Sequence, residues 1–411
     1  MPVPMLNILT FSTLFPNAVA PHHGIFTETS LRQQRRDYPL RSVVVAPVPW
    51  FPSRSPLFGR YAHHASVPHE EIRDGVRVLH PRYRHPPIMG MYSAPYALAR
   101  SARPVIAQLI ASGHDIDVID AHYFYPDGVA ATMLGRHFNK PVIISALGSD
   151  ITRLPDYAWP RRLMTQAAHR AFAMISVCEA LKTEMIRLGM PGERIHALRN
   201  GVDLELFHPE SYDQARAALG IDGFTLLSVG HLVELKGHDK VIAALPDLPD
   251  ARLVIVGDGP ERARLIQLAD RLGVRGRVRF AGLQSQARLR TFYSAADALV
   301  LASSREGWAN VLLEAMACGA PALASNVGGT AEVVTCHAAG RLLPDNSPAG
   351  VVDAVRGLRA HPPTRAATCA YARRHSWHAT TRAQYDLFAR AAGAHHRTSR
   401  TFDHVHQRPA A

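Results

Sequence analysis

Two successive series of short apolar segments constrain the fold of this 411-residue chain more than any other feature. The first series consists of LNILTFS near the start, SVVVAP from Ser42, DVIDAH from Asp117, PVIISALG from Pro141 and AMISVC from Ala173. The second consists of TLLSVG from Thr225, RLVIVGDG from Arg252, VRFAG from Val278, ADALVLAS from Ala296 and APALAS from Ala320. Each segment has the length of a strand and is followed by loop or helix-forming residues. Nearly continuous apolar strands that alternate with helices predict an α/β protein with two doubly wound parallel sheets, each covered on both faces.

The domain boundary is predicted where this pattern breaks, at NGVDLELFHP from Asn200, because a turn dipeptide, acidic residues and a proline interrupt it. We expect an amino-terminal domain over residues 1–205, a second domain over 206–365, closing helices over 366–394 and a polar, disordered tail over 395–411. Residues 53–90 are rich in Pro, Arg and His, which predicts an irregular excursion of the first domain that contains a short hairpin.

Composition and hydropathy argue against a membrane-spanning, a secreted or a disulfide-linked protein. No apolar run approaches the roughly 18 residues that cross a bilayer, and the first residues lack the basic region of a signal peptide. The four cysteines are far apart and form no C-x-x-C pair, which is typical of a reduced chain. We therefore expect a cytoplasmic protein.

The net charge is +12, from 46 basic and 34 acidic residues, so the partners we expect are anionic: nucleic acid, a membrane face or phosphorylated small molecules. A nucleic-acid-binding protein would interleave aromatic with basic residues on one element or carry a known motif, and neither is found. Nearly all the positive charge is arginine, which draws attention to the four lysines.

The segment REGWANVLLEAMACG places Glu306 in a loop after a strand and Glu314 about one turn inside a helix that begins near Asn310 and Val311. A helix amino terminus offers free N–H groups to a phosphate, and carboxylates accept hydrogen bonds from adjacent hydroxyl groups. The two glutamates would then hold a sugar and a ribose on either side of a diphosphate. The alternative is a solvated loop residue and a helix-surface residue.

A second loop, VGHLVELKGHD, again follows a strand. Gly230 begins the turn, His231 offers a donor, and Lys236 supplies a compact charge that suits a phosphate. The alternative for Lys236 is a solvated surface charge.

Three residues follow strands in the first domain. Gly24 would let backbone approach a ligand phosphate, His122 would touch a reacting centre, and Asp150 would face the ligand. The alternatives are a packed histidine for His122 and a local cap for Asp150.

These segments resemble the glycosyltransferases of family 4, which have the GT-B fold of two Rossmann-like domains facing a central cleft. The resemblance covers nearly the whole chain and rests on REGWANVLLEAMACGAPALAS, VGHLVELKGHD, NGVDLELFHP, DAHYFYPDG, ALGSD and HSWHATTRAQYDLF. The sequence around Glu306 is similar to that of bacterial members assigned to exopolysaccharide, teichuronic-acid-type or lipid-linked glycan assembly.

The resemblance implies a retaining enzyme that needs neither metal nor cofactor and takes a nucleotide diphospho-sugar, UDP- or GDP-linked, as donor. Glu314 would hold the ribose, Glu306 would contact the donor sugar, and Lys236 would neutralise the diphosphate with the helix start at Asn310 and Val311. His122 would lie beside the anomeric carbon, with Gly24, Gly230 and His231 near the diphosphate and Asp150 on the acceptor side.

Two departures from the family pattern stand out. His231 occupies a position where arginine is common, which replaces a fixed charge by a side chain that is in general mostly neutral at pH 7. Leu147 precedes the G-S-D turn where histidine is frequent, and this puts the acceptor-side role of that turn in doubt.

The acceptor is expected to be a glycan or a lipid-linked molecule at the inner face of the cytoplasmic membrane. Residues 159–172 mix aromatic, apolar and arginine residues as an interfacial helix would, or form a buried helix with a basic outer stripe. The competing functions are a nucleotide-sugar epimerase on the same fold and a basic nucleic-acid-binding protein. A glycan phosphorylase would need a lysine near its carboxyl end, and no lysine follows Lys240.

Overall fold

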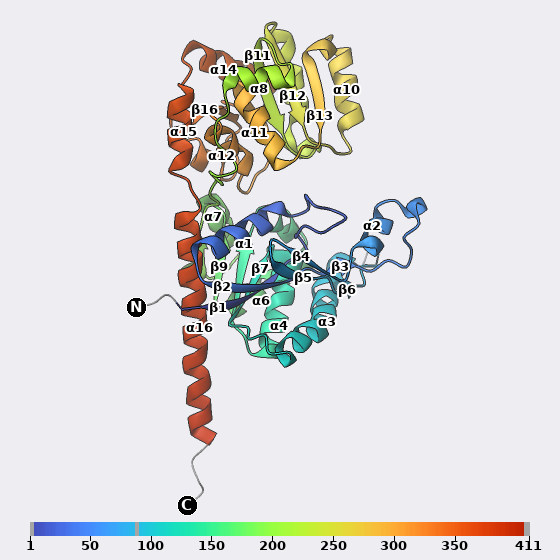
Figure 1. Ribbon diagram of the computed structural model, residues 1–411, viewed down its shortest axis with the longest axis vertical. Coiled ribbons are helices and arrows are strands. Elements are labelled where there is room, and N and C mark those ends of the chain that lie inside the picture. The colour runs from blue at the N-terminus through green and yellow to red at the C-terminus, as the bar shows by residue number, and fades with distance from the viewer. Residues whose placement is uncertain (1–3, 87–89, 407–411) are drawn as a thin grey trace, which may run out of the picture. The chain divides into compact units, whose positions relative to one another are not determined.

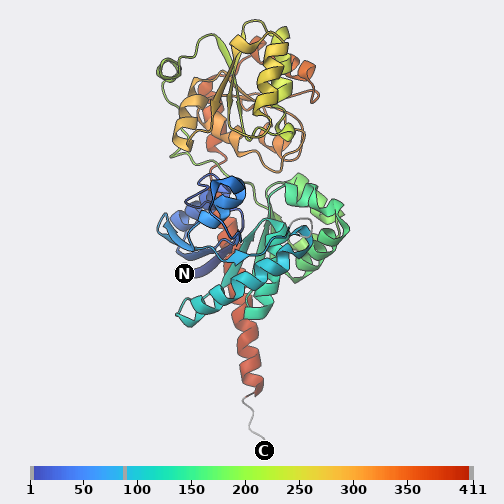
Figure 2. The ribbon, with the colours of Figure 1, turned by 90° about the vertical axis from the view of Figure 1, so that its right-hand side faces the viewer.

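The computed structural model describes residues 4–86 and 90–406, and the chain divides into two compact units. Unit 1 comprises the chain up to Arg199 together with the chain from His378 onward, and unit 2 comprises Asn200–Trp377. All ten predicted segments form strands, and helices cover both faces of each sheet (Figures 1 and 2). The predicted fold class is therefore confirmed.

The main sheet of unit 1 has eight strands in the order β10-β9-β8-β7-β1-β2-β5-β4. The strands are β1 (Leu6–Phe11), β2 (Leu40–Val45), β4 (Glu70–Arg73), β5 (Val76–Leu79), β7 (Val118–His122), β8 (Val142–Ala146), β9 (Ala173–Ser176) and β10 (Ile195–Ala197). Only β4 runs antiparallel to its neighbour among these described strands, and it forms a hairpin with β5. Two short strands, β3 (Val48–Pro49) and β6 (Arg82–Tyr83), pair separately.

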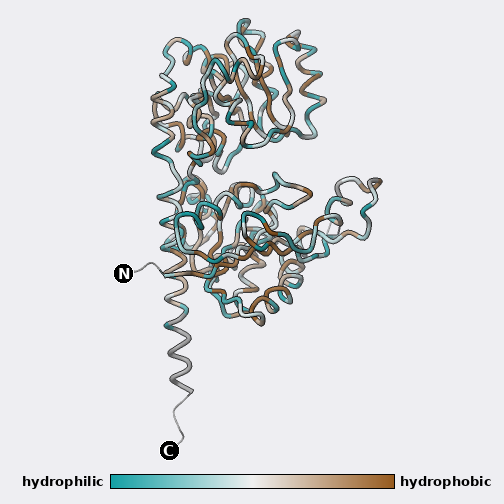
Figure 3. Tube along the Cα trace, in the orientation of Figure 1, coloured by the Kyte–Doolittle hydropathy of each residue, from teal (hydrophilic) through white to brown (hydrophobic). Residues whose placement is uncertain are grey.

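Helices pack on both faces of this sheet because successive residues of its buried strands point in opposite directions. The helices are α1 (Ile25–Asp37), α2 (Arg60–Ser66), α3 (Gly90–Ala111), α4 (Val129–Phe138), α5 (Ser149–Thr152), α6 (Ala158–Arg170), α7 (Glu179–Arg187) and α16 (His378–His406). Ile143 of β8 shares a core with Phe388 of α16, whereas its neighbour Ile144 lies against Gly128, directly before α4. Figure 3 shows the apolar character of the strands between these layers.

The ends of the predicted domains differ from the structure. The boundary between the units in the sequence lies between Arg199 and Asn200 rather than after residue 205. Of the two closing helices only α16 belongs to unit 1, because α15 (Arg365–Arg373) packs in unit 2. The disordered tail expected over 395–411 is wrong for residues 395–406, which continue α16. No proline occurs between Pro363 and Pro409, and each residue added to an existing helix gains a hydrogen bond at little cost. Residues 407–411 lie outside the described chain.

The sheet of unit 2 is parallel, with six strands in the order β13-β12-β11-β14-β15-β16. The strands are β11 (Phe224–Val229), β12 (Ala251–Val256), β13 (Val278–Gly282), β14 (Ala298–Leu301), β15 (Ala322–Ala324) and β16 (Gly340–Leu342). The helices are α8 (Tyr212–Leu219), α9 (His238–Ala244), α10 (Arg262–Arg271), α11 (Gln286–Ala295), α12 (Asn310–Ala317), α13 (Thr330–Val333), α14 (Pro348–Ala360) and α15. A core of buried aliphatic side chains joins α9, α10 and α14 to the strands.

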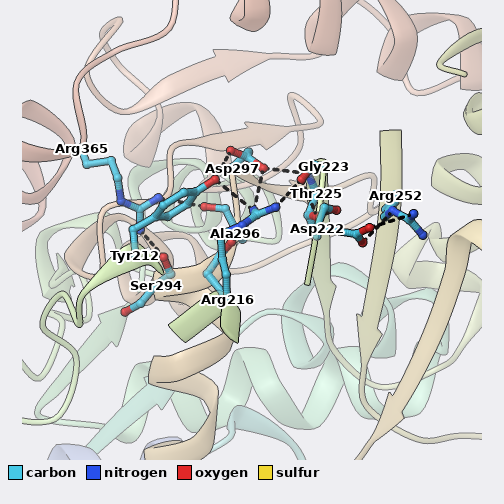
Figure 4. A network of polar contacts seen from close by, with 11 residues as sticks. Tyr212, Arg216, Asp222, Gly223, Thr225, Arg252, Ser294, Ala296, Asp297 and Arg365 are labelled. Atoms are coloured by element: carbon cyan, nitrogen blue, oxygen red, sulfur yellow. Dashed lines mark hydrogen bonds and ion pairs between the residues drawn. The ribbon is translucent and has the colours of Figure 1, made fainter. Parts of the chain in front are cut away.

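A polar network fixes the amino ends of β11 and β14 (Figure 4). Asp297 accepts hydrogen bonds from the Tyr212 hydroxyl at 2.8 Å, the Thr225 backbone N–H at 2.7 Å and Arg216 at 3.3 Å. Arg365 donates to backbone carbonyls at the end of α11 and lies over the Tyr212 ring, 4.9 Å from its centroid. Ligands of parallel α/β sheets bind at the carboxyl ends of the strands, so this network supports the fold from the opposite edge.

Replacing Phe388 by alanine is expected to lower the free energy of unfolding by about 3–5 kcal/mol, because a fully buried ring leaves a cavity between α16 and the sheet. Urea unfolding followed by circular dichroism measures the loss. Arg390→Ala, at an exposed position of the same helix, is the control and should change stability by no more than about 0.5 kcal/mol. Equal losses in the two variants would contradict the packing of α16 on unit 1.

Candidate active site

Lys236 and Glu306 come from two loops that follow neighbouring strands of unit 2, β11 and β14. The Lys236 ammonium donates to Glu306 Oε1 at 2.6 Å, and the Ser303 hydroxyl donates to the same oxygen at 2.7 Å. The Glu306 side chain is 9% exposed and the Lys236 side chain 25%. The sequence predicted both residues at this edge but not their ion pair, which holds a cation where a ligand can reach it.

Two glycines bring other main-chain segments against the loop that carries Glu306: Gly237 from the Lys236 loop and Gly328 from the loop after β15. Gly237, directly after Lys236, has a φ of 65°, and a Cβ there would lie 2.0 Å from the Ala302 carbonyl oxygen at the end of β14. Gly328 has a φ of 52°, and a Cβ there would lie 1.9 Å from the Glu306 carbonyl oxygen. Only glycine fits both the left-handed conformation and the missing space. The positions of the two charged residues are therefore set by backbone packing.

The helix α12 begins at Asn310, where the sequence predicted a helix start. Within the described chain no side chain caps this helix, and Asn310 Oδ1 instead accepts from Asn200 Nδ2 at 3.3 Å. The first N–H groups of a helix, here those from Asn310 and Val311 onward, have no partner inside the helix and favour an anion. Trp308, which the sequence analysis missed, is buried beside this terminus, and its indole N–H has no partner in the part of the chain that the structure describes.

Glu314 lies in the second turn of α12 and accepts a hydrogen bond from the Tyr293 hydroxyl at 2.8 Å. Burial raises the pKa of Glu314 to about 7, although the bond from Tyr293 opposes this shift. A carboxyl group with such a pKa changes its charge near neutral pH. Tyr293 is fully buried on α11 and was not predicted, because nothing in the spacing relates it to α12.

The loop after β11 also places Gly230 and His231. The Lys236 side chain lies against Gly230, where a Cβ would stand 3.7 Å from Lys236 Cδ. His231 is exposed. His238, also missed, is buried behind the loop with its Nδ1 2.8 Å from the Ser228 hydroxyl, and burial lowers its pKa to about 4. Because His238 is neutral at pH 7, it adds no charge to Lys236.

In unit 1, His122 is the last residue of β7, and its Nε2 lies 2.8 Å from Asp120 Oδ2. Both residues are buried, with 4% and 2% of their surfaces exposed. With the ring proton on Nε2, the histidine donates to the carboxylate and leaves Nδ1 as an acceptor. Asp120 was not predicted, yet residues two apart on a strand share a face, so the alternation could have identified it.

Asp150 and Gly24 lie after β8 and β1, the neighbours of β7 in the sheet. The buried carboxylate of Asp150 accepts from the backbone N–H groups of Phe124 and Gly148, both at 2.7 Å, and burial raises its pKa. These bonds come from residues that precede Asp150, so the carboxylate ties two loops together and does not cap the helix that follows. Gly24, at the start of α1, packs on Leu14, whose carbonyl oxygen would lie 2.2 Å from an added Cβ.

Another buried carboxylate, missed by the sequence analysis, joins the loops after β1 and β7. Asp127 accepts from the Thr13 N–H at 2.5 Å and from the Thr13 hydroxyl at 3.0 Å, and burial raises its pKa to about 7. Residues 4–86 and 90–406 contain no group of three or more His, Cys, Asp or Glu arranged to hold a metal ion. The predicted residues thus lie at the carboxyl edge of the sheet of their own unit: a lysine and an uncapped helix start beside two carboxyl groups in unit 2, and a histidine–aspartate pair in unit 1.

Two family models match the chain. The model described as Glycosyltransferase Family 4 matches residues 23–206, and the model described as Glycosyl transferases group 1 matches residues 211–375.

Curated relatives match over most of the chain. A putative teichuronic acid biosynthesis glycosyltransferase, TuaC, of Bacillus subtilis (strain 168) is 28% identical over 81% of this chain and 84% of its own length. A D-inositol 3-phosphate glycosyltransferase of Catenulispora acidiphila is 32% identical over 74% of this chain and 77% of its own length.

Solved structures share the fold. The sucrose-phosphate synthase of Thermosynechococcus elongatus matches with a TM-score of 0.75 at 19% identity, over 95% of this chain and all of that one. Anabaena HepE in complex with UDP-glucose matches with a TM-score of 0.64 at 19% identity, over 96% of this chain and 99% of that one.

Replacing Glu314 by glutamine is expected to remove a pH-dependent loss of stability. Because burial raises the pKa of Glu314 from 4.5 to about 7, the folded chain keeps this proton in a range where the unfolded chain has released it. The free energy of unfolding of the wild type should therefore fall, relative to that of the variant, by about 2–3 kcal/mol as the pH rises through this range. Urea unfolding at several pH values between about 4.5 and about 8 measures the difference.

The matched control for this experiment is Asp353→Asn, at an exposed position of α14. Its stability should follow that of the wild type at every pH. A constant difference between the wild type and Glu314→Gln would show that Glu314 titrates normally.

Proposed function

Because the chain belongs to glycosyltransferase family 4, we propose that it is a retaining, metal-independent enzyme of cell-surface polysaccharide biosynthesis. It moves a sugar from a nucleotide diphospho-sugar, UDP- or GDP-linked, to a glycan or lipid-linked acceptor. The observation that carries the proposal is the Lys236–Glu306 pair, 2.6 Å apart, on loops at the carboxyl edge of the unit 2 sheet. The GT-B fold and the glycosyltransferase class follow from the family itself.

The donor is held by unit 2. The Lys236 ammonium and the free N–H groups of α12 at Asn310 and Val311 stabilise the charge that develops on the departing diphosphate, which is the task a metal ion would otherwise have. Glu314 accepts hydrogen bonds from the ribose hydroxyls, and Glu306 accepts one from a hydroxyl of the transferred sugar. A lysine ammonium has three donors, so Lys236 binds a phosphate oxygen and keeps Glu306 oriented.

The acceptor side is assigned to unit 1. His122, oriented by Asp120, lies beside the anomeric carbon, and Gly24 lies near the diphosphate. Asp150 contributes by fixing the loops after β7 and β8, because its carboxylate already accepts backbone hydrogen bonds. Retention of configuration is proposed on the family resemblance, since fixed donors on the diphosphate keep the leaving group on the face where the acceptor attacks.

The proposed place of action is the cytoplasm, at the inner face of the membrane, where a lipid-linked acceptor would be presented. The similarity to TuaC, a putative teichuronic acid biosynthesis glycosyltransferase of 28% identity, supports the polysaccharide assignment. Among the described helices, none combines the length and the apolar character that a membrane span requires.

Donor binding is tested by thermal unfolding of the purified protein with UDP-, GDP- and ADP-sugars and the free nucleotides. One nucleotide series should raise the melting temperature, because a ligand bound only by the native state stabilises it. Glu314→Ala should lose this shift and all transfer. Glu306→Ala should keep most of the shift and lower the turnover number by about 100-fold, as loss of one transition-state contact does.

The control for the donor experiment is Asp353→Ala, at the exposed α14 position used above, which should keep both the shift and the turnover. Full activity in Glu306→Ala and Glu314→Ala together would overturn the site. A folded wild type that no nucleotide sugar stabilises and that transfers no sugar would overturn the proposed function.

Restoring the common family residue at position 231 is expected to tighten donor binding. An arginine is always charged and binds phosphate with two hydrogen bonds, so His231→Arg should lower the donor Kd about threefold to tenfold near pH 7.5. Isothermal titration calorimetry measures the change. His361→Arg, at an exposed position in the same unit, adds the same charge elsewhere and should leave the Kd unchanged. Equal affinities of the wild type and His231→Arg would show that this side chain does not contact the diphosphate.

A further inference from the structure

Four large exposed apolar side chains of unit 1 lie in one short stretch, residues 50–61, hereafter the apolar arm. Trp50 is 53% exposed, Leu57 93%, Phe58 48% and Tyr61 47%. The arm is ordered, because the Phe51 ring packs on Phe58 and Tyr61 with centroids 5.3 and 5.4 Å apart. Soluble proteins rarely leave a contiguous cluster of large apolar side chains in water unless the cluster contacts a partner.

The arm leaves unit 1 at the edge that carries His122. It starts after β3, which follows the carboxyl end of β2, and it includes the 3-10 turn Pro56–Phe58 and the first residues of α2. In Figure 1, α2 lies beyond β3 and β6, away from the centre of the sheet. Tyr92 and Tyr96, in the first turns of α3, are also exposed and lie near Tyr125, three residues after His122. Exposed aromatic side chains thus occur both in the arm and at the start of α3.

The charge of this region identifies the partner. No Asp or Glu occurs between Asp37 and Glu70, whereas the same stretch contains basic or titratable nitrogen side chains at Arg41, Arg54, Arg60, His63, His64 and His69. The first acidic side chain after the arm, Glu70, is paired with Arg77 at 2.7 Å. Exposed Trp and Tyr rings with cations and no anions match the headgroup region of an anionic bilayer, where amphipathic rings and basic side chains concentrate.

The helix that the sequence suggested as a membrane contact buries most of its apolar side chains, although Trp159 in its first turn is 40% exposed. In α6, the side chains of Pro160, Leu163, Met164, Ala167 and Ala168 are buried within unit 1. Its outer side presents Arg161, Arg162 and Arg170. This segment is therefore a largely buried helix with a basic outer stripe and one exposed tryptophan, whereas the arm carries four large exposed apolar side chains within residues 50–61.

We propose that the apolar arm docks the protein on an anionic lipid bilayer, with Leu57 and Phe58 at the acyl boundary and Arg54 among the headgroup phosphates. Arg54 is held for this role by a hydrogen bond from its Nε to the Ala65 carbonyl at 3.2 Å. Docking through the arm turns the edge of the sheet that carries His122 toward a surface where a lipid-linked acceptor resides. The inference rests on the proposed place of action at the membrane and names the surface that makes the contact, and docking itself requires no particular sugar or donor.

Vesicle sedimentation with the full chain tests the proposal. The wild type should bind vesicles of phosphatidylglycerol and phosphatidylcholine, bind pure phosphatidylcholine weakly, and be released from the anionic vesicles by salt. Leu57→Asp and Phe58→Asp should each lower the partition coefficient at least about tenfold, because burial of the side chain at the acyl boundary is lost and a charge of the wrong sign is added. Leu57 is 93% exposed, so Leu57→Asp should not change the melting temperature, whereas Phe58→Asp also removes the ring contact with Phe51.

Leu283→Asp is the matched control, since this leucine of unit 2 is 63% exposed and lies outside the arm. It should bind anionic vesicles as the wild type does. Unchanged binding in Leu57→Asp and Phe58→Asp would overturn the proposal, as would a wild type that binds neither kind of vesicle, which would assign the arm to a protein partner. Donor binding is measured without vesicles, so failure of docking and failure of the transferase function are separate results.

Discussion

The site of unit 2 depends on main chains that touch without a side chain between them. At Gly237 and Gly328 an added Cβ would overlap a carbonyl oxygen of the loop that carries Glu306 or of the strand before it. The Ser304 backbone N–H donates to the Leu235 carbonyl at 2.9 Å, which joins the loop that carries Glu306 to the loop that carries Lys236. Backbone contacts of this kind cannot relax by a change of rotamer, so they fix Lys236 relative to Glu306 more firmly than their own flexible side chains could. A rigid site is what electrostatic stabilisation of a leaving group requires.

The amino and carboxyl edges of the unit 2 sheet differ in whether their polar groups have hydrogen-bond partners within the protein. At the amino edge, both carboxylate oxygens of Asp297 accept hydrogen bonds, from Tyr212, Thr225 and Arg216. At the carboxyl edge, the start of α12 has no side-chain cap among the described residues, and burial raises the pKa of Glu314. Hydrogen bonds that stabilise the fold therefore lie at the amino edge. The uncapped N–H groups of α12 and the buried carboxyl group of Glu314 lie at the carboxyl edge, where the proposed ligand would supply their hydrogen-bond partners.

The sequence predicted the features that depend on residues close together in the chain, and it did not predict those that depend on contacts between residues far apart in the chain. Apolar runs located all ten expected strands, and the loop-to-helix sequence located Glu306, Lys236 and the start of α12. The partner of Glu314 is Tyr293, which reaches it from another helix, and no periodicity relates the two. The length of α16 was missed because a polar sequence resembles a tail, whereas its first half is anchored by Phe388 and the helix continues from there. Asp150 was predicted to face a ligand, but its depth and its backbone partners depend on how two loops fold together.

The ion pair between Lys236 and Glu306 also limits how each residue can act. Glu306 Oε1 already accepts from Lys236 and Ser303, so its second oxygen is the one available to a sugar hydroxyl. Removal of either partner would leave the other as a poorly compensated charge, since both are largely shielded from water. The two residues therefore act as one unit, and the effect of substituting either contains the cost of stranding its partner. For this pair, the binding of a phosphate and the orientation of a sugar are two consequences of one interaction.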